Sequence, residues 1–540
     1  MPLPRRADGG ETAAGAVAPP WWRRQRVPLT AVAVVVPLYA VWGLFLATGG
    51  GDLAAQLAWT GFTARHPGAA YNLSWYGGTH TANYSVFSSY VMAFVGVRTV
   101  SVAAGLAGTW LLAVLFERRG MAHPLLPALF GAFALWCNVA SGRTTFALGV
   151  AIGLVACLYA ERAVVAVAAG ALSTMASPVS GLFLVVTGAA YLLDRQWRKG
   201  VYLVVPFFVV VGSTSLLFPF HGEQPMPGNR VWMPLAVCAV LVVAAPAGRA
   251  WLLLRYGAVV YAVGVVLTYF VASPIGTNVE RLLGLVAPPL LLAAASALRR
   301  EGSRRRAAVM ALALVVSCGW LLNKTVSDLR VSSKEPVWAA HTEGVVAELR
   351  RLGADRGRVE VVPARNHREA TVLSPYVNMA RGWNRQLDVE RGRLFYDGTF
   401  SPKEYRAWLD RWAVGFVVLH HGKPDGPARA EAELVAAGQP WLTPVWRDAG
   451  WTVYRVHDAT PLVQAPAQVV RGDDAELVVR MPEAGSVTIR VAHSPWLRAR
   501  GTDGGRACLR PDGEWTRLTV PKGGTYRLDS AYRLPRDGGC

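Results

Sequence analysis

The chain has 540 residues, of which 53% are hydrophobic and 17% are charged. Charge this scarce excludes an ordinary soluble protein of this length, and the length predicts more than one domain. The net charge of +20 has two explanations, which are nucleic-acid binding and the excess of Lys and Arg in cytoplasmic loops of membrane proteins. The basic clusters lie between apolar blocks, which favours the second explanation, and no nucleic-acid partner is expected. These clusters are Arg23–Arg26, Arg118–Arg119, Arg195–Lys199 and Arg299–Arg306.

Residues 1–27 form a basic tail, and the apolar run 29–47 that follows is too long for the core of a signal peptide. We interpret this run as the first transmembrane helix, because a spanning helix needs about twenty apolar residues. The sequence predicts an α-helical polytopic membrane domain over residues 28–325 with about eleven spans. The candidate spans are 29–47, 99–116, 122–138, 145–160, 163–177, 179–193, 201–218, 232–247, 254–272, 282–298 and 307–322.

Alternating the spans from a cytoplasmic N-terminus places every strong basic cluster inside, as the positive-inside rule requires. An odd number of spans then places the C-terminal region outside the cytoplasm. Two of the blocks, 163–177 and 179–193, are short and meet at Ser177-Pro178, which is typical of a broken or re-entrant pair. The apolar segment Tyr84–Val97 is also short, and we interpret it as a juxtamembrane or partly inserted helix.

Residues 326–458 alternate helical and strand-like stretches, which predicts an extracytoplasmic α/β domain. Its helix at Ser401–Trp412 opens with a good N-cap and a proline at the first helical position. The segment Arg381–Asp388 combines aromatic and charged groups in a predicted loop, where it could bind a glycan or a lipid headgroup or anchor this domain to the membrane domain.

Residues 459–540 contain short β-runs between Gly- and Pro-bearing turns, a pattern typical of a small β-sandwich. Cys508 and Cys540 lie in this region and could pair in an oxidising compartment. The other four cysteines lie inside apolar blocks and are most simply packing residues.

The first external loop, residues 48–98, is long for a connection, which favours a functional role. Asp52 follows the first helix directly, and a carboxylate at this boundary could act as general base on a sugar hydroxyl or could simply end the helix. Trp75 and Tyr76 could stack on a sugar ring or belong to the aromatic belt. His66 and His80 could position a phosphate or a hydroxyl, although loop histidines are more often polar surface.

Two arginines on the predicted outer side fit a lipid phosphate. Arg143 and Arg281 each begin a helix, where the guanidinium and free backbone N–H groups suit a phosphate. Glu280 could contribute to the same site or could be only the structural partner of Arg281.

The order of these features resembles the GT-C superfamily of membrane glycosyltransferases. The resemblance lies in Asp52 after the first helix, the long external loop, the segment Tyr84–Val97 before Arg98, and a helix that ends at Leu115–Gly120. The C-terminal part, with Ser494-Pro495-Trp496 and its turns, is similar to the β-domain of bacterial proteins that glycosylate surface polymers. It also looks like that of actinobacterial membrane proteins labelled as hypothetical or as transporters.

The resemblance implies a multi-pass cell-membrane enzyme that moves a sugar from a polyprenyl-phosphate donor to a cell-envelope glycan or lipid acceptor, with membrane lipid around it. The position that matches the catalytic acid is Asp52. Many relatives carry a second acid beside it, which Leu53 and Ala54 replace here. We therefore expect no cofactor and no metal site. Two other functions stay open, a transporter or flippase for a lipid-linked saccharide and a non-catalytic scaffold for envelope assembly.

Overall fold

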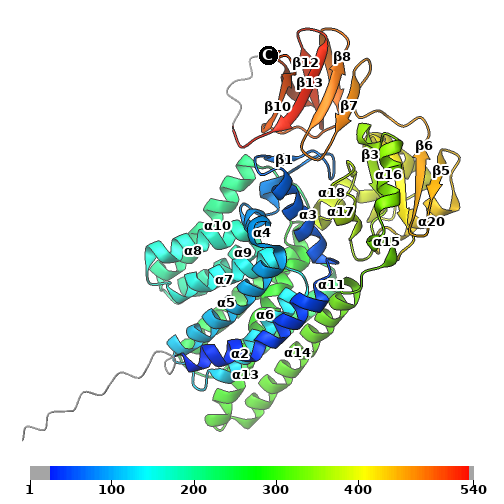
Figure 1. The fold of residues 1–540 in the computed structure, drawn as a ribbon. Coiled ribbons are helices and arrows are strands. Elements are labelled where there is room, and N and C mark those ends of the chain that lie inside the picture. Colours follow the sequence, from blue (N-terminus) through cyan, green and yellow to red (C-terminus); the bar gives the residue numbers. More distant parts are fainter. Residues whose placement is uncertain (1–24, 534–540) are drawn as a thin grey trace, which may run out of the picture.

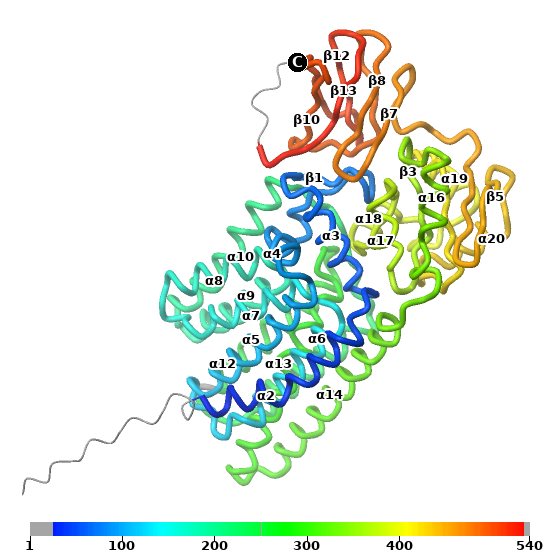
Figure 2. Tube along the Cα trace, in the orientation of Figure 1, coloured from blue at the N-terminus to red at the C-terminus, as the bar shows by residue number. Residues whose placement is uncertain are grey.

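The computed structural model describes residues 25–533 and divides them into a helical domain, an α/β region and a C-terminal β-sandwich. Figures 1 and 2 show both strand-containing regions at one end of the helical domain. The sharp change in composition near residue 326 therefore marks the structural boundary between the apolar helices and the strand-containing regions.

Each of the eleven predicted apolar blocks contains a helix. These helices are α2 (Arg26–Val41, continued by the π-helix Trp42–Leu46), α5 (Val97–Arg118), α6 (Leu125–Ala140), α7 (Thr144–Leu158), α8 (Ala163–Ala176), α9 (Pro178–Leu193), α10 (Trp197–Leu217), α11 (Gly228–Ala244), α12 (Arg249–Phe270), α13 (Glu280–Arg300) and α14 (Arg304–Ser332). Among the described residues, six helices are long and apolar enough to cross a membrane, and five apolar helices are shorter. A multi-pass helical domain is confirmed in this sense, while the count of eleven spans stays a prediction.

The break between α8 and α9 has a local cause. Ser177 is extended, with φ −156°, and Pro178 starts α9 at its first position. A proline cannot donate the backbone hydrogen bond that would continue α8, so the helix ends just before it. With 14 residues, α8 rises only about 21 Å, which is less than the hydrocarbon thickness of about 30 Å.

The long first loop is itself structured. It contains α3 (Asp52–Arg65), the hairpin of β1 (Tyr71–Asn72) and β2 (Thr79–His80), a 3-10 turn (Thr81–Asn83) and α4 (Ser88–Val95). The eight residues of α4 rise only about 12 Å, too little to cross a membrane alone. Phe94 on this helix is 90% exposed, which fits the predicted juxtamembrane position.

The α/β region contains a four-stranded sheet in the order β3-β4-β6-β5, with β3 and β4 parallel and the other pairs antiparallel. Its strands are β3 (Arg358–Val361), β4 (Val414–His420), β5 (Leu442–Arg447) and β6 (Trp451–Val456), and its longer helices are α16 (Glu343–Arg351), α18 (Arg385–Arg391), α19 (Pro402–Arg411) and α20 (Arg429–Ala437). The predicted cap of α19 forms, since Ser401 Oγ accepts from Glu404 N at 3.2 Å.

The C-terminal region has one sheet in the order β10-β13-β8-β7 and a second in the order β11-β12-β9. The strands are β7 (Gln468–Gly472), β8 (Leu477–Met481), β9 (Gly485–Ile489), β10 (Leu497–Gly501), β11 (Cys508–Asp512), β12 (Trp515–Val520) and β13 (Gly524–Ser530). Apolar side chains from both sheets form one core, which includes Val479, Ile489 and Leu518. The predicted pairing of Cys508 involves Cys540, which lies outside the described residues.

The first loop joins the sandwich to the helical domain. Tyr71 N donates to Ser530 Oγ at 3.0 Å, and Tyr71 OH donates to Ala492 O at 3.0 Å. From the sandwich side, Trp496 Nε1 donates to Leu217 O at the end of α10, at 2.7 Å. These contacts fix the strand-containing regions over the same ends of the helices, where the candidate site lies.

Candidate functional site

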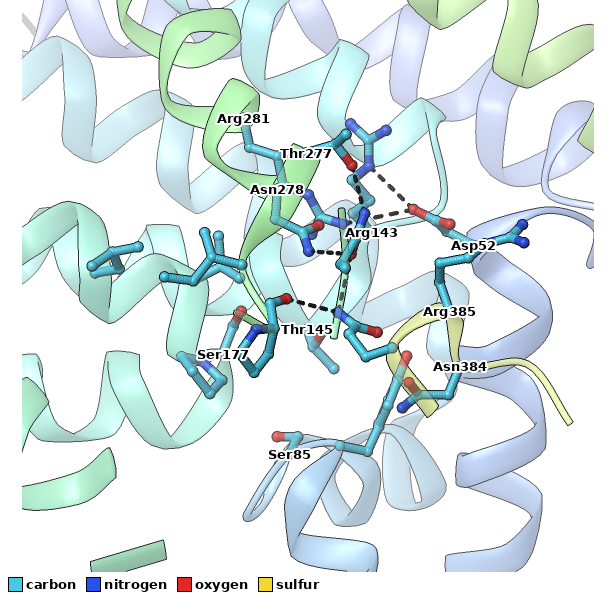
Figure 3. Close-up of a pocket in the computed structure, with 18 of the residues that line it drawn as sticks. Asp52, Ser85, Arg143, Thr145, Ser177, Thr277, Asn278, Arg281, Asn384 and Arg385 are labelled. Carbon is cyan, nitrogen blue, oxygen red and sulfur yellow. Dashed lines mark hydrogen bonds and ion pairs between the residues drawn. The ribbon is translucent and has the colours of Figure 1, made fainter. Parts of the chain in front are cut away.

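A cavity of about 1100 Å³ lies where the helical domain meets the α/β region. Its walls come from the start of α3, the start of α7, the joint between α8 and α9, the end of α10, the loop before α13, the end of α14 and the segment Trp383–Gln386 of the α/β region. Figure 3 shows Asp52 and Arg143 beside one another on its wall, with Asn384 and Arg385 on the same side as Asp52.

Glycines place Asp52 at this wall. Gly51 has φ +66°, and a Cβ on Gly50 would lie 2.8 Å from Ser332 O at the end of α14. Gly142 has φ +79°, and a Cβ there would lie 2.7 Å from Leu53 N. Only glycine combines a positive φ with such close backbone approach, so these positions bring the starts of α3 and α7 together.

Asp52 is held by two arginines. Its Oδ2 lies 3.2 Å from Arg143 Nε and 3.9 Å from Arg281 Nη2, and its side chain is 36% exposed. Arg143 Nη2 also contacts Asp328 Oδ2 at 3.2 Å. Arg281 lies over the Phe146 ring at 5.3 Å, and a planar guanidinium is suited to such stacking.

Asp328 is the functional candidate that the sequence analysis missed. It belongs to α14, far along the chain from Asp52. The available signal was a polar face on an apolar helix, since Lys324 and Asp328 are four residues apart and lie on one side of a helix. Both residues line the cavity.

Glu280 is almost fully buried and pairs with Lys324, while Arg230 Nη1 lies 3.5 Å from its Oε2. It therefore balances these two cations. Among the described residues, no ion pair joins it to Arg281, the partner considered for it from the sequence. Burial of a carboxylate is costly unless it is paired, and the pairing explains why Glu280 sits at the wall as a charged group.

Amide side chains close the cavity between the two domains. Gln224 Oε1 accepts from Asn278 Nδ2 at 2.9 Å and from Gln386 Nε2 at 3.1 Å. Gln224 Nε2 in turn donates to Thr277 Oγ1 at 2.5 Å. The helical domain and the α/β region thus meet here through neutral hydrogen bonds.

A further part of the cavity wall is mainly apolar. Phe207, Val210 and Val211 of α10 line the cavity, together with Leu182 of α9 and Trp232 of α11. The neighbouring residue Phe208 is 60% exposed on the outside of α10. The helix α10 therefore carries apolar side chains both toward the cavity and on its exposed side.

Of the eight residues predicted for the site, four line the cavity, namely Asp52, Arg143, Glu280 and Arg281. The other four lie elsewhere. His66 contacts Asp474 at 2.9 Å, and His80 is buried with its Nε2 at 2.9 Å from Ser494 Oγ. Burial lowers the pKa of His80 to about 4, so the ring is neutral near pH 7 and provides no charge for a phosphate.

The predicted aromatic pair is buried in the protein. Trp75 is 2% exposed and Tyr76 is 1% exposed. Tyr76 OH donates to Gly382 O at 2.9 Å and accepts from Asn384 N at 3.2 Å. A Cβ on Gly382 would lie 2.1 Å from the Trp75 ring. The pair therefore supports the segment that lines the cavity, and neither ring is itself part of the cavity wall.

One group in the described part of the chain has the spacing for a metal ion, His66 with Asp473 and Asp474, whose ligand atoms lie within 4.8 Å of one another. Asp474 is already paired with Arg65 at 2.6 Å, and Asp473 Oδ1 accepts from Ala475 N and Glu476 N. These partners explain the cluster as a structural contact between the first loop and the sandwich.

Comparisons with known proteins give one family model and several solved structures. Residues 464–540 match the family described as a domain of unknown function, DUF8823. No curated protein sequence matches the chain.

Three of the similar solved structures are of the arabinofuranosyltransferase AftD from Mycobacteria, two of them of a mutant. Each is 12% identical to this chain and covers 94% of it, with TM-scores of 0.45, 0.44 and 0.42. The chain spans only 57–60% of the length of those proteins. Identity and TM-score this low do not establish a shared activity.

Proposed function

We propose that the protein is a membrane glycosyltransferase that moves a sugar from a polyprenyl-phosphate donor to an acceptor in the cell envelope, outside the cytoplasm. The observation that carries this proposal is the cavity wall on which one carboxylate, Asp52, lies within 3.9 Å of two arginines. The same cavity has an apolar wall from α10. A lipid-linked phosphosugar needs both kinds of wall.

The charges of the cavity favour an anionic ligand. Four basic side chains of the helical domain line the cavity with three carboxylates, which are Arg143, Arg230, Arg281 and Lys324 with Asp52, Glu280 and Asp328. Arg143 and Arg281 are the two that contact Asp52, and arginine binds phosphate oxygens through paired N–H groups. A donor phosphate bound here would replace carboxylate contacts with its own oxygens.

The apolar wall suits the prenyl chain of such a donor. Phe207, Val210 and Val211 line the same cavity as the ion pairs. Burial of a prenyl chain against them contributes about 25 cal/mol for each Å² of apolar surface removed from water. Phosphate recognition and chain recognition therefore lie in one cavity.

In this proposal Asp52 acts as general base. In the transfer, an acceptor oxygen forms a bond to the anomeric carbon, the bond from that carbon to the phosphate oxygen breaks, and its electron pair stays on the phosphate. Asp52 takes the acceptor proton, while Arg143 and Arg281 stabilise the phosphate as it leaves.

Binding of a polyprenyl phosphate to the purified protein tests the phosphate site. Arg143→Gln and Arg281→Gln should each weaken binding by about tenfold or more, because a hydrogen bond to a charged group contributes roughly 1.5–3 kcal/mol. Arg330→Gln is the matched control. Arg330 is an exposed arginine near Asp328 on α14, and it does not line the cavity.

A prenyl alcohol of equal length lacks the phosphate, so it should bind weakly to the wild type and to the Arg143→Gln, Arg281→Gln and Arg330→Gln variants. Unchanged phosphate binding in both single variants and in the double variant, with melting temperatures like that of the wild type, would contradict the assignment.

A further inference from the structure

The α/β region contributes four consecutive residues, Trp383–Gln386, to the cavity wall. Nothing in the phosphate site requires them, since Arg143 and Arg281 come from the helical domain. We propose that this segment binds hydroxyl groups of the acceptor glycan and holds them beside Asp52. The inference rests on the proposed function and names the wall that recognises the acceptor.

The segment is held rigidly next to Asp52. Trp383 Nε1 donates at 3.2 Å to Gly51 O, the carbonyl directly before Asp52. The indole also stacks on His367 with ring centroids 3.4 Å apart. Tyr76 OH fixes the backbone through Gly382 O and Asn384. An oxygen bound by this segment is therefore positioned relative to the start of α3.

Two side chains of the segment keep donors for a ligand. Arg385 Nη1 donates to Tyr396 OH and Nη2 to Asp425 Oδ2, both at 2.6 Å. These bonds use two of its five N–H groups and fix the guanidinium at the wall. Asn384 Oδ1 caps α18 by accepting from Leu387 N at 3.1 Å, and its amide nitrogen has no hydrogen-bond partner within the described part of the chain.

This donor set fits sugar hydroxyls better than a lipid. The segment belongs to the α/β region, whereas the apolar wall for a prenyl chain is α10. Side-chain N–H donors on a cavity wall select ligands with oxygen acceptors, because a donor left unpaired there loses a hydrogen bond to water. An acceptor glycan held between the segment and Asp52 would present its hydroxyl to the base.

The test compares two ligands on purified full-length protein, a polyprenyl phosphate and an immobilised panel of cell-envelope oligosaccharides. Asn384→Ser keeps a capping oxygen, removes the amide donor and adds no charge, and Arg385→Lys keeps the charge and removes the planar fork. Each variant should weaken oligosaccharide binding about tenfold or more and leave polyprenyl-phosphate binding unchanged. Arg393→Lys, an exposed arginine outside the cavity, should change neither.

Wild-type binding of oligosaccharides by both variants, or no oligosaccharide bound by the wild type, would overturn the assignment. Loss of polyprenyl-phosphate binding in place of oligosaccharide binding would assign the segment to the donor. Failure of the proposed function is separate, because in that case the wild-type protein binds no polyprenyl phosphate.

Discussion

Arg143 lies between two carboxylates that come from opposite ends of the membrane domain in sequence. Its Nε contacts Asp52 and its Nη2 contacts Asp328, each at 3.2 Å. Asp52 and Asp328 are both about one third exposed, so these pairs are open to a competing anion. A phosphate that takes over Arg143 would leave Asp52 free to accept a proton while Asp328 keeps the arginine in place.

The residues of the site were only partly predictable. Asp52 was found because it directly follows the first predicted helix, and Arg143 and Arg281 because each begins a helix on the predicted outer side; the structure brings the three together. Asp328 was missed because its approach to Arg143 depends on how α14 packs. Trp75 and Tyr76 were predicted as sugar contacts from their residue type, yet their burial under Gly382 follows from tertiary packing that the sequence does not encode locally.

Two buried histidines make stability depend on pH. Burial lowers the pKa of His80 and of His420 to about 4, from about 6.5 in the unfolded chain. The unfolded chain then binds more protons between these values, so stability is complete above about pH 6.5 and falls as the pH drops toward 4. At about pH 5 each histidine should cost about 2 kcal/mol.

The melting temperature of His420→Asn should therefore fall less between about pH 7 and pH 5 than that of the wild type. Asparagine can still accept from Gly422 N, which donates to His420 Nδ1 at 3.0 Å. The exposed His457 provides the control His457→Asn, which should follow the wild type. An identical pH dependence in wild type and His420→Asn would show that His420 titrates normally.

Elements were predicted best where periodicity and end signals coincide. All eleven apolar blocks contain helices, and α19 begins at its predicted cap. The strands missed were β1 and β2 of the first loop and the edge strands β5, β10 and β11. Pro444 lies inside β5 and charged residues interrupt β10, so neither segment has the usual strand pattern in the sequence. Edge strands tolerate proline and charge that central strands exclude.

A buried ion cluster joins the elements of the α/β region. Arg381 Nη2 contacts Glu360 Oε1 of β3 at 2.5 Å and also pairs with Glu431 of α20. All three side chains are at most 2% exposed. Burial raises the pKa of Glu360 well above its usual range, even though Arg381 opposes this. One guanidinium thus holds two carboxyl groups at the centre of the region.

Arg381→Met should lower the free energy of unfolding by about 3–5 kcal/mol, because it leaves buried carboxyl groups without their cation. Arg351→Met is the control, since Arg351 is 69% exposed and pairs with Glu348 on one helix, and it should change the free energy of unfolding little. Chemical denaturation followed by tryptophan fluorescence measures both. Equal, small losses in the two variants would mean that the cluster contributes little to stability.

At the scale of the whole molecule, the candidate site is a product of domain assembly. The helical domain supplies the ion pairs and the apolar wall, and the α/β region supplies the segment Trp383–Gln386. Figure 1 shows the strand-containing regions at one end of the helices. The sequence predicted these regions and their order, but the cavity between them depends on contacts such as Trp383 with Gly51 that join distant parts of the chain.

The extracytoplasmic position of this assembly stays a prediction from the basic clusters. The cavity is lined by the ends of helices that this topology places on the outer side of the membrane, including those near Thr145, Ser177 and Arg281. A lipid-linked donor and an envelope acceptor would then meet in a single compartment.

The central claim is that Asp52 is the base of a sugar transfer, and turnover of Asp52→Asn on purified protein tests it most directly. Asparagine keeps the size of the side chain and removes the basic oxygen. A positioned general base typically contributes about 10²–10⁴-fold, so transfer from a polyprenyl-phosphate-linked sugar should fall at least about a hundredfold. Melting temperature and polyprenyl-phosphate binding should stay near the wild-type values, and Asp397→Asn, at an exposed aspartate outside the cavity, should transfer normally. Full turnover by a well-folded Asp52→Asn protein would contradict the account and favour a transporter or scaffold.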